Sequence, residues 1–174
     1  MRLRKGRPVN ARSVATMMPP VIPPHPRAPD DRWLASFPLR SFLELGAYDT
    51  APGSARGHTR NVLNEWRLEA FEEEVTLIVS EVVTNSVTAT RRAKWAARLP
   101  PIRLWLLAGP GGVLVAVWDA VPGGPQPREA GDLDESGRGL QIVETLSTRF
   151  DWYLPPAPHA GKVTRVLITS PQGT

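Results

Sequence analysis

The sequence FEEEVTLIVSEVVTNSVT, residues 71–88, predicts one long amphipathic helix. Its apolar side chains recur at the spacing of one helix face: Phe71, Val75, Ile78, Val79 and Val82. Glu81 and Asn85 lie beside this face and are four residues apart, so both side chains can contact the same ligand. The helix alone leaves two interpretations open. Either both side chains are solvated, or Glu81 is a general base and Asn85 a ligand of a hard cation.

The composition indicates one cysteine-free domain with a core of its own. A chain of 174 residues is long enough to bury such a core, and the absence of cysteine excludes disulfides and thiolate metal sites. No aliphatic run is long enough to span a bilayer, and no secretory signal peptide begins the sequence. We therefore expect a soluble, cytoplasmic protein without membrane contact.

The positive charge is confined to the N-terminal part. Residues 1–40 carry eight Lys and Arg against two acids, whereas residues 41–174 carry thirteen against fifteen. The folded part is therefore mildly acidic, and no direct binding of nucleic acid by it is expected. Seven prolines stand within Met1–Asp30. We expect residues 1–35 to be a disordered, basic, Pro-rich arm and residues 36–171 to be the domain.

The role of this arm is left open by its sequence. It is either an unstructured extension or a contact for an acidic partner or nucleic acid. Because Met1–Asp30 offers little apolar surface to bury, its removal is expected to leave the melting temperature within a few degrees of the full chain.

Short apolar segments and their turn residues predict an α+β domain. Pro38 indicates that the first strand lies at a sheet edge, and Ser54 is the predicted N-cap of the first helix. The order β-α-α-β-β-loop-α-β-β predicts a two-layer sandwich, a mixed β-sheet with helices on one face. Strands are predicted at 40–45, 102–108, 113–118, 150–154 and 163–169, and helices at 55–66, 69–91 and from 137 onward.

Three further motifs carry chemistry besides the long helix. Asp119 ends a buried strand, where a carboxylate can accept hydrogen bonds from an exocyclic amine or simply start a turn. Gly137-Arg138-Gly139 opens a helix, where glycines and free N–H groups admit a phosphate. Gly161-Lys162-Val163-Thr164 enters the last strand, where the Thr164 hydroxyl can bind a base or a water. Each motif is weak alone.

Together and in this order, the four motifs resemble those of the GHKL ATPase superfamily, over about residues 40–170. The segments SEVVTNSV (80–87) and GRGLQIV (137–143) look like its branch of bacterial anti-sigma regulatory factor kinases. The resemblance implies the Bergerat ATP-binding fold, with ATP and Mg²⁺ as cofactors.

The resemblance also implies roles for individual residues. By analogy Glu81 is the catalytic base, Asn85 binds Mg²⁺ and Asp119 holds the adenine amino group, with Thr164 near the adenine. By the same analogy Gly137 and Gly139 line the nucleotide phosphates, and Gly123 is a further cofactor-binding residue. Arg138 either binds a phosphate or is a surface residue, and both roles are open.

One position departs from the family pattern. The first glycine box is typically Asp-x-Gly-x-Gly, but here it runs Asp119-Ala120-Val121-Pro122-Gly123. Val121 replaces the middle glycine, so the turn beside the adenine has to form without it.

The resemblance implies a transferase that acts in transcription regulation, a serine/threonine protein kinase. Such a protein phosphorylates an anti-anti-sigma partner and sequesters a sigma factor, and a homodimer is expected by the same analogy. The alternative is a nucleotide-gated or non-catalytic switch protein that only sequesters its partner. Glu81 and Asn85 favour the kinase, and Val121 favours the switch. A sensor histidine kinase fits less well, because all three histidines stand in Pro/Gly-rich or turn contexts: His25, His58 and His159.

Overall fold

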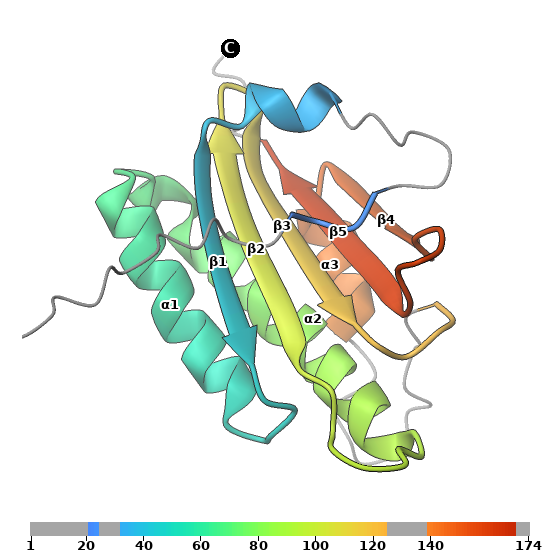
Figure 1. The fold of residues 1–174 in the computed structure, drawn as a ribbon. Helices are drawn as coiled ribbons and strands as arrows, with labels where there is room; N and C mark the ends of the chain where they lie inside the picture. Colours follow the sequence, from blue (N-terminus) through green and yellow to red (C-terminus); the bar gives the residue numbers. More distant parts are fainter. Residues whose placement is uncertain (1–20, 25–31, 125–138, 170–174) are drawn as a thin grey trace, which may run out of the picture.

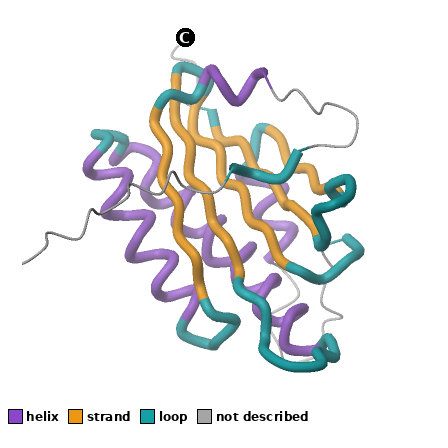
Figure 2. Tube along the Cα trace, in the orientation of Figure 1, coloured by secondary structure: helices purple, strands orange, loops and turns teal. Residues whose placement is uncertain are grey.

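The computed structural model describes residues 21–24, 32–124 and 139–169, which form a β-sheet with three α-helices on one face (Figures 1 and 2). The helices are α1 (Ala51–Glu65), α2 (Glu72–Arg92) and α3 (Gly139–Leu146), with short 3-10 helices η1 (Arg32–Ser36) and η2 (Glu69–Phe71). The strands are β1 (Leu39–Leu45), β2 (Ile102–Gly109), β3 (Gly112–Asp119), β4 (Arg149–Tyr153) and β5 (Lys162–Ile168). The predicted two-layer α+β fold is therefore confirmed.

The sheet has the strand order β1-β2-β3-β5-β4, and every neighbouring pair is antiparallel. The expectation of a mixed sheet was wrong in this respect. Helix α3 does return the chain so that β4 runs in the same direction as β3. The two do not pair, because β5 lies between them and is antiparallel to both. The prediction that the first strand is an edge strand is confirmed.

Helix α1 begins four residues before the predicted start. Thr50 is its N-cap residue, and Pro52 lies in the first turn, where the missing proline N–H removes a donor that has no helical partner anyway. Ser54 is consequently not the N-cap. Its hydroxyl lies inside the first turn and donates to the Thr50 carbonyl oxygen at 3.2 Å.

Helix α2 lies along the middle of the helix layer, and its apolar stripe fills the main core. Val75, Ile78, Val79 and Val82 are each 2% exposed or less. They pack with the inward-facing residues of β2 and β3. Burial of each such side chain contributes about 1.5–3 kcal/mol. The helical periodicity of residues 71–88 therefore predicted the buried face correctly.

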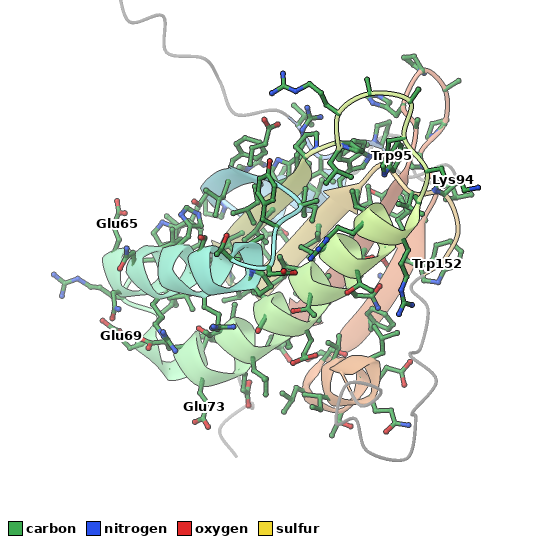
Figure 3. The ribbon with its side chains drawn as sticks, turned by 90° about the horizontal axis from the view of Figure 1, so that it is seen from below. Glu65, Glu69, Glu73, Lys94, Trp95 and Trp152 are labelled. Carbon is green, nitrogen blue, oxygen red and sulfur yellow. The ribbon has the colours of Figure 1, made fainter. Side chains whose placement is uncertain are left out.

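Charge at the two ends of α2 matches the helix dipole. Three glutamates stand in its first turn and two arginines in its last turn. Figure 3 shows Glu73 and Lys94 at opposite ends of this helix, with Glu65 and Glu69 near the acidic end. Within the part of the chain that the structure describes, no helix is long and apolar enough to cross a membrane.

The sheet face opposite the helices carries a second apolar cluster. Two N-terminal pieces, Val21–Pro24 and η1, lie within the range expected to be a disordered arm. Ile22 and Phe37 from this end of the chain pack into the cluster. Arg40 fixes the end of η1, because its guanidinium donates to the carbonyl oxygens of Leu34 and Phe37. Residues 1–20 and 25–31 lie outside the described residues.

Candidate functional site

The predicted site residues that the structure describes come from α2, β3, α3 and β5 and from the loop after β3. Helix α2 contacts both α3 and β3. On β3, Val113, Val115 and Val117 point into the helix-side core. Asp119 continues this alternation, so its side chain also enters the helix side at the end of the strand. Helix α2 therefore packs against both the strand that ends at Asp119 and the helix that begins at Gly139.

Glu81 lies against the first residue of α3. A Cβ atom built on Gly139 would collide with Oε2 of Glu81 and would lie 3.2 Å from its Cδ atom. A side chain at this position would therefore have to displace the Glu81 carboxylate from its place at the start of the helix. Two residues that the sequence analysis assigned to one site are in direct contact, although they come from different motifs.

Asn85 lies one turn beyond Glu81 on α2, and both side chains are half-buried. Among the described residues, no three His, Cys, Asp or Glu side chains gather into a metal cluster. Any cation here would take few protein ligands. Mg²⁺ is commonly held in this way, with phosphates and waters completing its shell.

Asp119 is fully buried, and its two carboxylate oxygens differ. Oδ1 accepts a hydrogen bond from Lys162 Nζ at 2.7 Å and another from the Val121 N–H at 3.0 Å. Oδ2 is buried and has no hydrogen-bond partner among the described residues. An unsatisfied buried acceptor costs about 1–3 kcal/mol, so this oxygen can accept a hydrogen bond from a donor outside the described residues. The exocyclic amine of adenine is such a donor.

Lys162 is the partner that the sequence analysis missed. It is 2% exposed and stands opposite Asp119 in the β3–β5 register. Gly161, at φ +84°, makes this pairing possible, because a Cβ there would collide with the Asp119 carbonyl oxygen. The signal was present in the Gly-Lys step before the last strand. The sequence could not show which residue of β3 lies opposite that step.

Thr164 occupies the same side of the sheet as Asp119 and Lys162. It is 3% exposed and stands opposite Val117 on β3 and Trp152 on β4. Its pair with Val117 is thus the next pair on this side of the sheet after Asp119 and Lys162, and its place near the adenine stays a prediction.

The turn after Asp119 forms without the missing middle glycine. The Val121 N–H is bonded to the Asp119 carboxylate, as in an Asx-turn. The positive φ that the turn needs is supplied at Gly123, with φ +101°. No atom lies within 4 Å of a Cβ built on Gly123, so space is open beside it. Val121 is thus compatible with the glycine-box turn.

The remaining predicted phosphate residues, Gly137 and Arg138, lie outside the described residues, as does most of the loop at 120–136. A hollow of about 710 Å³ lies elsewhere, on the flank of α2 that faces α1. Charged side chains such as Arg56, Arg60 and Glu73 line it. Glu81 contacts α3 on the other flank, so this groove is separate from the site.

Comparison with protein families matches residues 49–166, more than half of the chain, to the histidine kinase-like ATPase domain. None of the curated proteins compared with the chain matches it. A solved structure with a similar fold is that of the RsbU and RsbW domains of Rv1364c from Mycobacterium tuberculosis, with a TM-score of 0.52 and 21% sequence identity. The match covers 75% of this chain and 32% of that one, so the chain spans about a third of that protein's length. The likeness supports the fold, and the family match covers both α2 and Asp119. The chain therefore belongs to the family of histidine kinase-like ATPase domains.

Proposed function

We propose that the protein binds ATP with Mg²⁺ and is a serine/threonine protein kinase of the anti-sigma regulatory type. The single observation that carries the proposal is Asp119 Oδ2, a buried carboxylate oxygen without a donor among the described residues, at the end of a strand that packs against α2. Family membership supplies the nucleotide class. An adenine amine at Oδ2 would complete the hydrogen bonds of the carboxylate, with Thr164 beside the base.

Glu81 and Asn85 provide the chemistry on α2. Mg²⁺, when bound, neutralises phosphate charge, and Asn85 is its proposed protein ligand. Glu81 takes the proton of an incoming serine or threonine hydroxyl, whose oxygen bonds to the γ-phosphorus as ADP leaves. Gly139 positions this base, because its lack of a side chain admits the Glu81 carboxylate. Gly123, Gly137 and Arg138 are proposed around the phosphates.

The proposed partners follow from the RsbW resemblance and not from a described surface. The acceptor is an anti-anti-sigma protein, and the sequestered partner is a sigma factor. We propose a homodimer without direct contact to nucleic acid. The solved structure with a similar fold holds RsbU and RsbW domains in one protein.

The second candidate is a switch protein that sequesters its partner without phosphoryl transfer. The Asp119–Lys162 pair favours it, because the carboxylate charge is already balanced inside the protein. The folded protein would then depend less on a bound nucleotide for its stability. This candidate predicts partner binding without any transferase activity.

Phosphoryl transfer from labelled ATP to candidate partners separates the two functions. Glu81→Gln is expected to bind Mg-ATP as wild type does and to lose transfer by about a hundredfold or more. Asn85→Ala should lose both Mg-dependent binding and transfer. Glu74→Gln is the matched control, an exposed glutamate on the same helix, and should behave as wild type. Wild type that sequesters a sigma factor but phosphorylates no partner would leave the switch function standing.

Gly139→Ala tests the position of the base without removing it. Alanine favours a helix over glycine, so stability should not fall, yet the new Cβ must displace the Glu81 carboxylate. Transfer should drop, and the double variant with Glu81→Gln should be no slower than Glu81→Gln alone. Additive losses would show that Gly139 acts on something other than Glu81.

A further inference from the structure

The outer face of the sheet carries a buried apolar patch. All three α-helices of the described chain lie on the other face (Figure 1), yet six apolar side chains of the outer face are each 5% exposed or less. The buried outer-face residues are Trp105, Leu107, Leu114, Ala116, Tyr153 and Val163. Ile22 joins this cluster from the N-terminal segment and is itself only 6% exposed. The cover of the face is therefore provided in part by the chain's own N-terminal residues.

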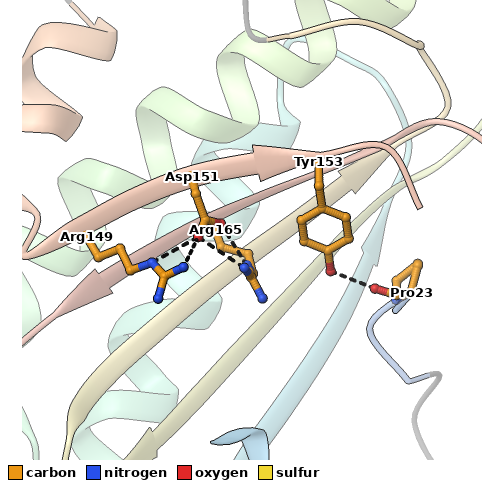
Figure 4. A network of polar contacts seen from close by, with 5 residues as sticks. All are labelled: Pro23, Arg149, Asp151, Tyr153 and Arg165. Atoms are coloured by element: carbon orange, nitrogen blue, oxygen red, sulfur yellow. Dashed lines mark hydrogen bonds and ion pairs between the residues drawn. The ribbon is translucent and has the colours of Figure 1, made fainter. Parts of the chain in front are cut away.

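A polar contact fixes the segment at a defined place on the face. The Tyr153 hydroxyl donates a buried hydrogen bond of 2.6 Å to the Pro23 carbonyl oxygen (Figure 4). The Tyr153 ring is held in turn by the Arg165 guanidinium, whose Cζ lies 4.8 Å from the ring centroid. Asp151 binds that guanidinium through two hydrogen bonds. The donor is thus oriented by a network within β4 and β5.

The segment has one side toward the sheet and one toward solvent. Val21 is 83% exposed, whereas the next residue, Ile22, is buried. Pro23 and Pro24 follow and offer carbonyl acceptors but no N–H donors, so burying their backbone leaves no donor unpaired. Their restricted φ angles also reduce the entropy lost on docking.

We propose that the outer face of the sheet is a docking surface for an extended apolar segment that contains proline, and that Val21–Pro24 occupies it as an intramolecular strap. The surface recognises one buried aliphatic side chain, Ile22, and the carbonyl oxygen that follows it. Any other ligand of the face must displace the strap. Removal of Met1–Asp30 is accordingly expected to expose apolar surface and to lower the melting temperature by more than a few degrees, contrary to the expectation from the sequence.

Thiol labelling in the full chain tests the strap directly, because the protein has no cysteine of its own. Ile22→Cys and Val21→Cys each introduce one thiol, one residue apart. Under native conditions the thiol at position 22 should react with a maleimide at least tenfold more slowly than the thiol at position 21. The two rates should be equal in denaturant. Equal native rates at the two positions would overturn the strap.

Tyr153→Phe in the Ile22→Cys background removes only the hydroxyl donor. Labelling should become about two- to tenfold faster, the effect of one hydrogen bond. Tyr48→Phe, at an exposed tyrosine, is the matched control and should leave the rate unchanged. Because cysteine is smaller than isoleucine, the pair Ile22→Asp and Val21→Asp provides a second measurement. Only Ile22→Asp should increase binding of a dye for apolar surfaces, and an unchanged signal would overturn the proposal.

Dilution identifies the origin of the segment. A labelling rate at position 22 that does not change with protein concentration supports an intramolecular strap. Faster labelling on tenfold dilution would show that the segment comes from a second copy of the chain, and the intramolecular proposal would fail.

Discussion

Two ion pairs lie on opposite sides of β5, and their carboxylates are satisfied to different degrees. On the helix side, Lys162 reaches one oxygen of Asp119 and leaves the other without a partner among the described residues. On the outer side, Arg165 binds both oxygens of Asp151, at 2.8 and 3.0 Å, and Arg149 adds a further bond (Figure 4). Both oxygens of Asp151 are therefore bonded, whereas within the described residues only one oxygen of Asp119 is.

The difference follows from the chemistry of the two cations. The planar guanidinium of arginine presents a fork that matches both carboxylate oxygens, whereas the lysine ammonium is a point charge at the end of a flexible stem. A pair in which both carboxylate oxygens are bonded leaves no carboxylate oxygen without a donor. An incomplete pair balances charge while it leaves an acceptor available. The comparison therefore supports the proposal that Asp119 binds a ligand and that Asp151 serves stability.

The largest effect is expected from Asp119→Asn. It leaves the Lys162 ammonium buried without a counter-charge, which costs about 3–5 kcal/mol. Urea denaturation should show this loss. A Lys162→Met change in the same chain should recover most of it, because the unpaired charge is then gone. If the double variant is no more stable than Asp119→Asn alone, the ion pair is not the source of the loss.

Asp151→Asn is expected to destabilise by a smaller amount, about 2–3 kcal/mol. Arg165 loses its counter-charge, but the Asp151 side chain is 26% exposed, so water compensates in part. The same variant should bind nucleotide as wild type does. A fall in ATP affinity in a titration would mean that the outer pair also serves the site, and the division between the pairs would be wrong.

Nucleotide affinity sharpens the comparison further. Asp119→Asn is tested together with Lys162→Met, because the double variant has no unpaired buried charge, and its affinity is compared with that of wild type. The Asp119→Asn change replaces an acceptor oxygen with a donor facing the adenine amine. Affinity for ATP should fall roughly ten- to a hundredfold, about 1.5–3 kcal/mol. Unchanged affinity in calorimetry would remove Asp119 from the adenine site.

The smallest expected effect is on the pH dependence of the free energy of unfolding. Burial lowers the pKa of His58 from its ordinary value of 6.5, and its Nε2 lies 2.9 Å from the Ser41 hydroxyl oxygen. The unfolded chain therefore binds this proton more readily than the folded chain. The contribution to stability is fully present above about pH 6.5 and is lost as the pH falls below it.

His58→Gln should flatten this part of the stability profile, and exposed His159→Gln should leave it as in wild type. Denaturation at several pH values between 5 and 8 provides the check. A profile that His58→Gln does not alter would assign the slope to other groups.

Local patterns predicted the elements well, and long-range pairings poorly. The 3.6-residue period of α2 identified its buried face, and the Gly-Pro-Gly-Gly turn at 109–112 identified the β2–β3 hairpin. The start of α1 was misplaced because Ser54 looked like a cap and Pro52 was not recognised as a first-turn residue. For the site, the resemblance supplied Glu81 and Asp119, while Lys162 needed the β3–β5 register.

The strap could not be predicted at all from composition. Ile22 is a single large apolar residue in a Pro-rich segment, and such segments usually bury too little to fold. It becomes ordered because the sheet offers an apolar face and a tyrosine donor more than a hundred residues later in the chain.

The position of β5 inside the sheet has a consequence for how the molecule assembles. It leaves the ribosome after every other described element, yet it lies between β3 and β4 and carries one partner of each ion pair. Until it inserts, the edges of β3 and β4 that pair with it are open, Asp119 lacks Lys162 and Asp151 lacks Arg165. Insertion of β5 therefore closes the sheet and forms the Asp119–Lys162 and Asp151–Arg165 ion pairs in one event. A folding intermediate without β5 would be inactive, and its open strand edges would be prone to aggregation.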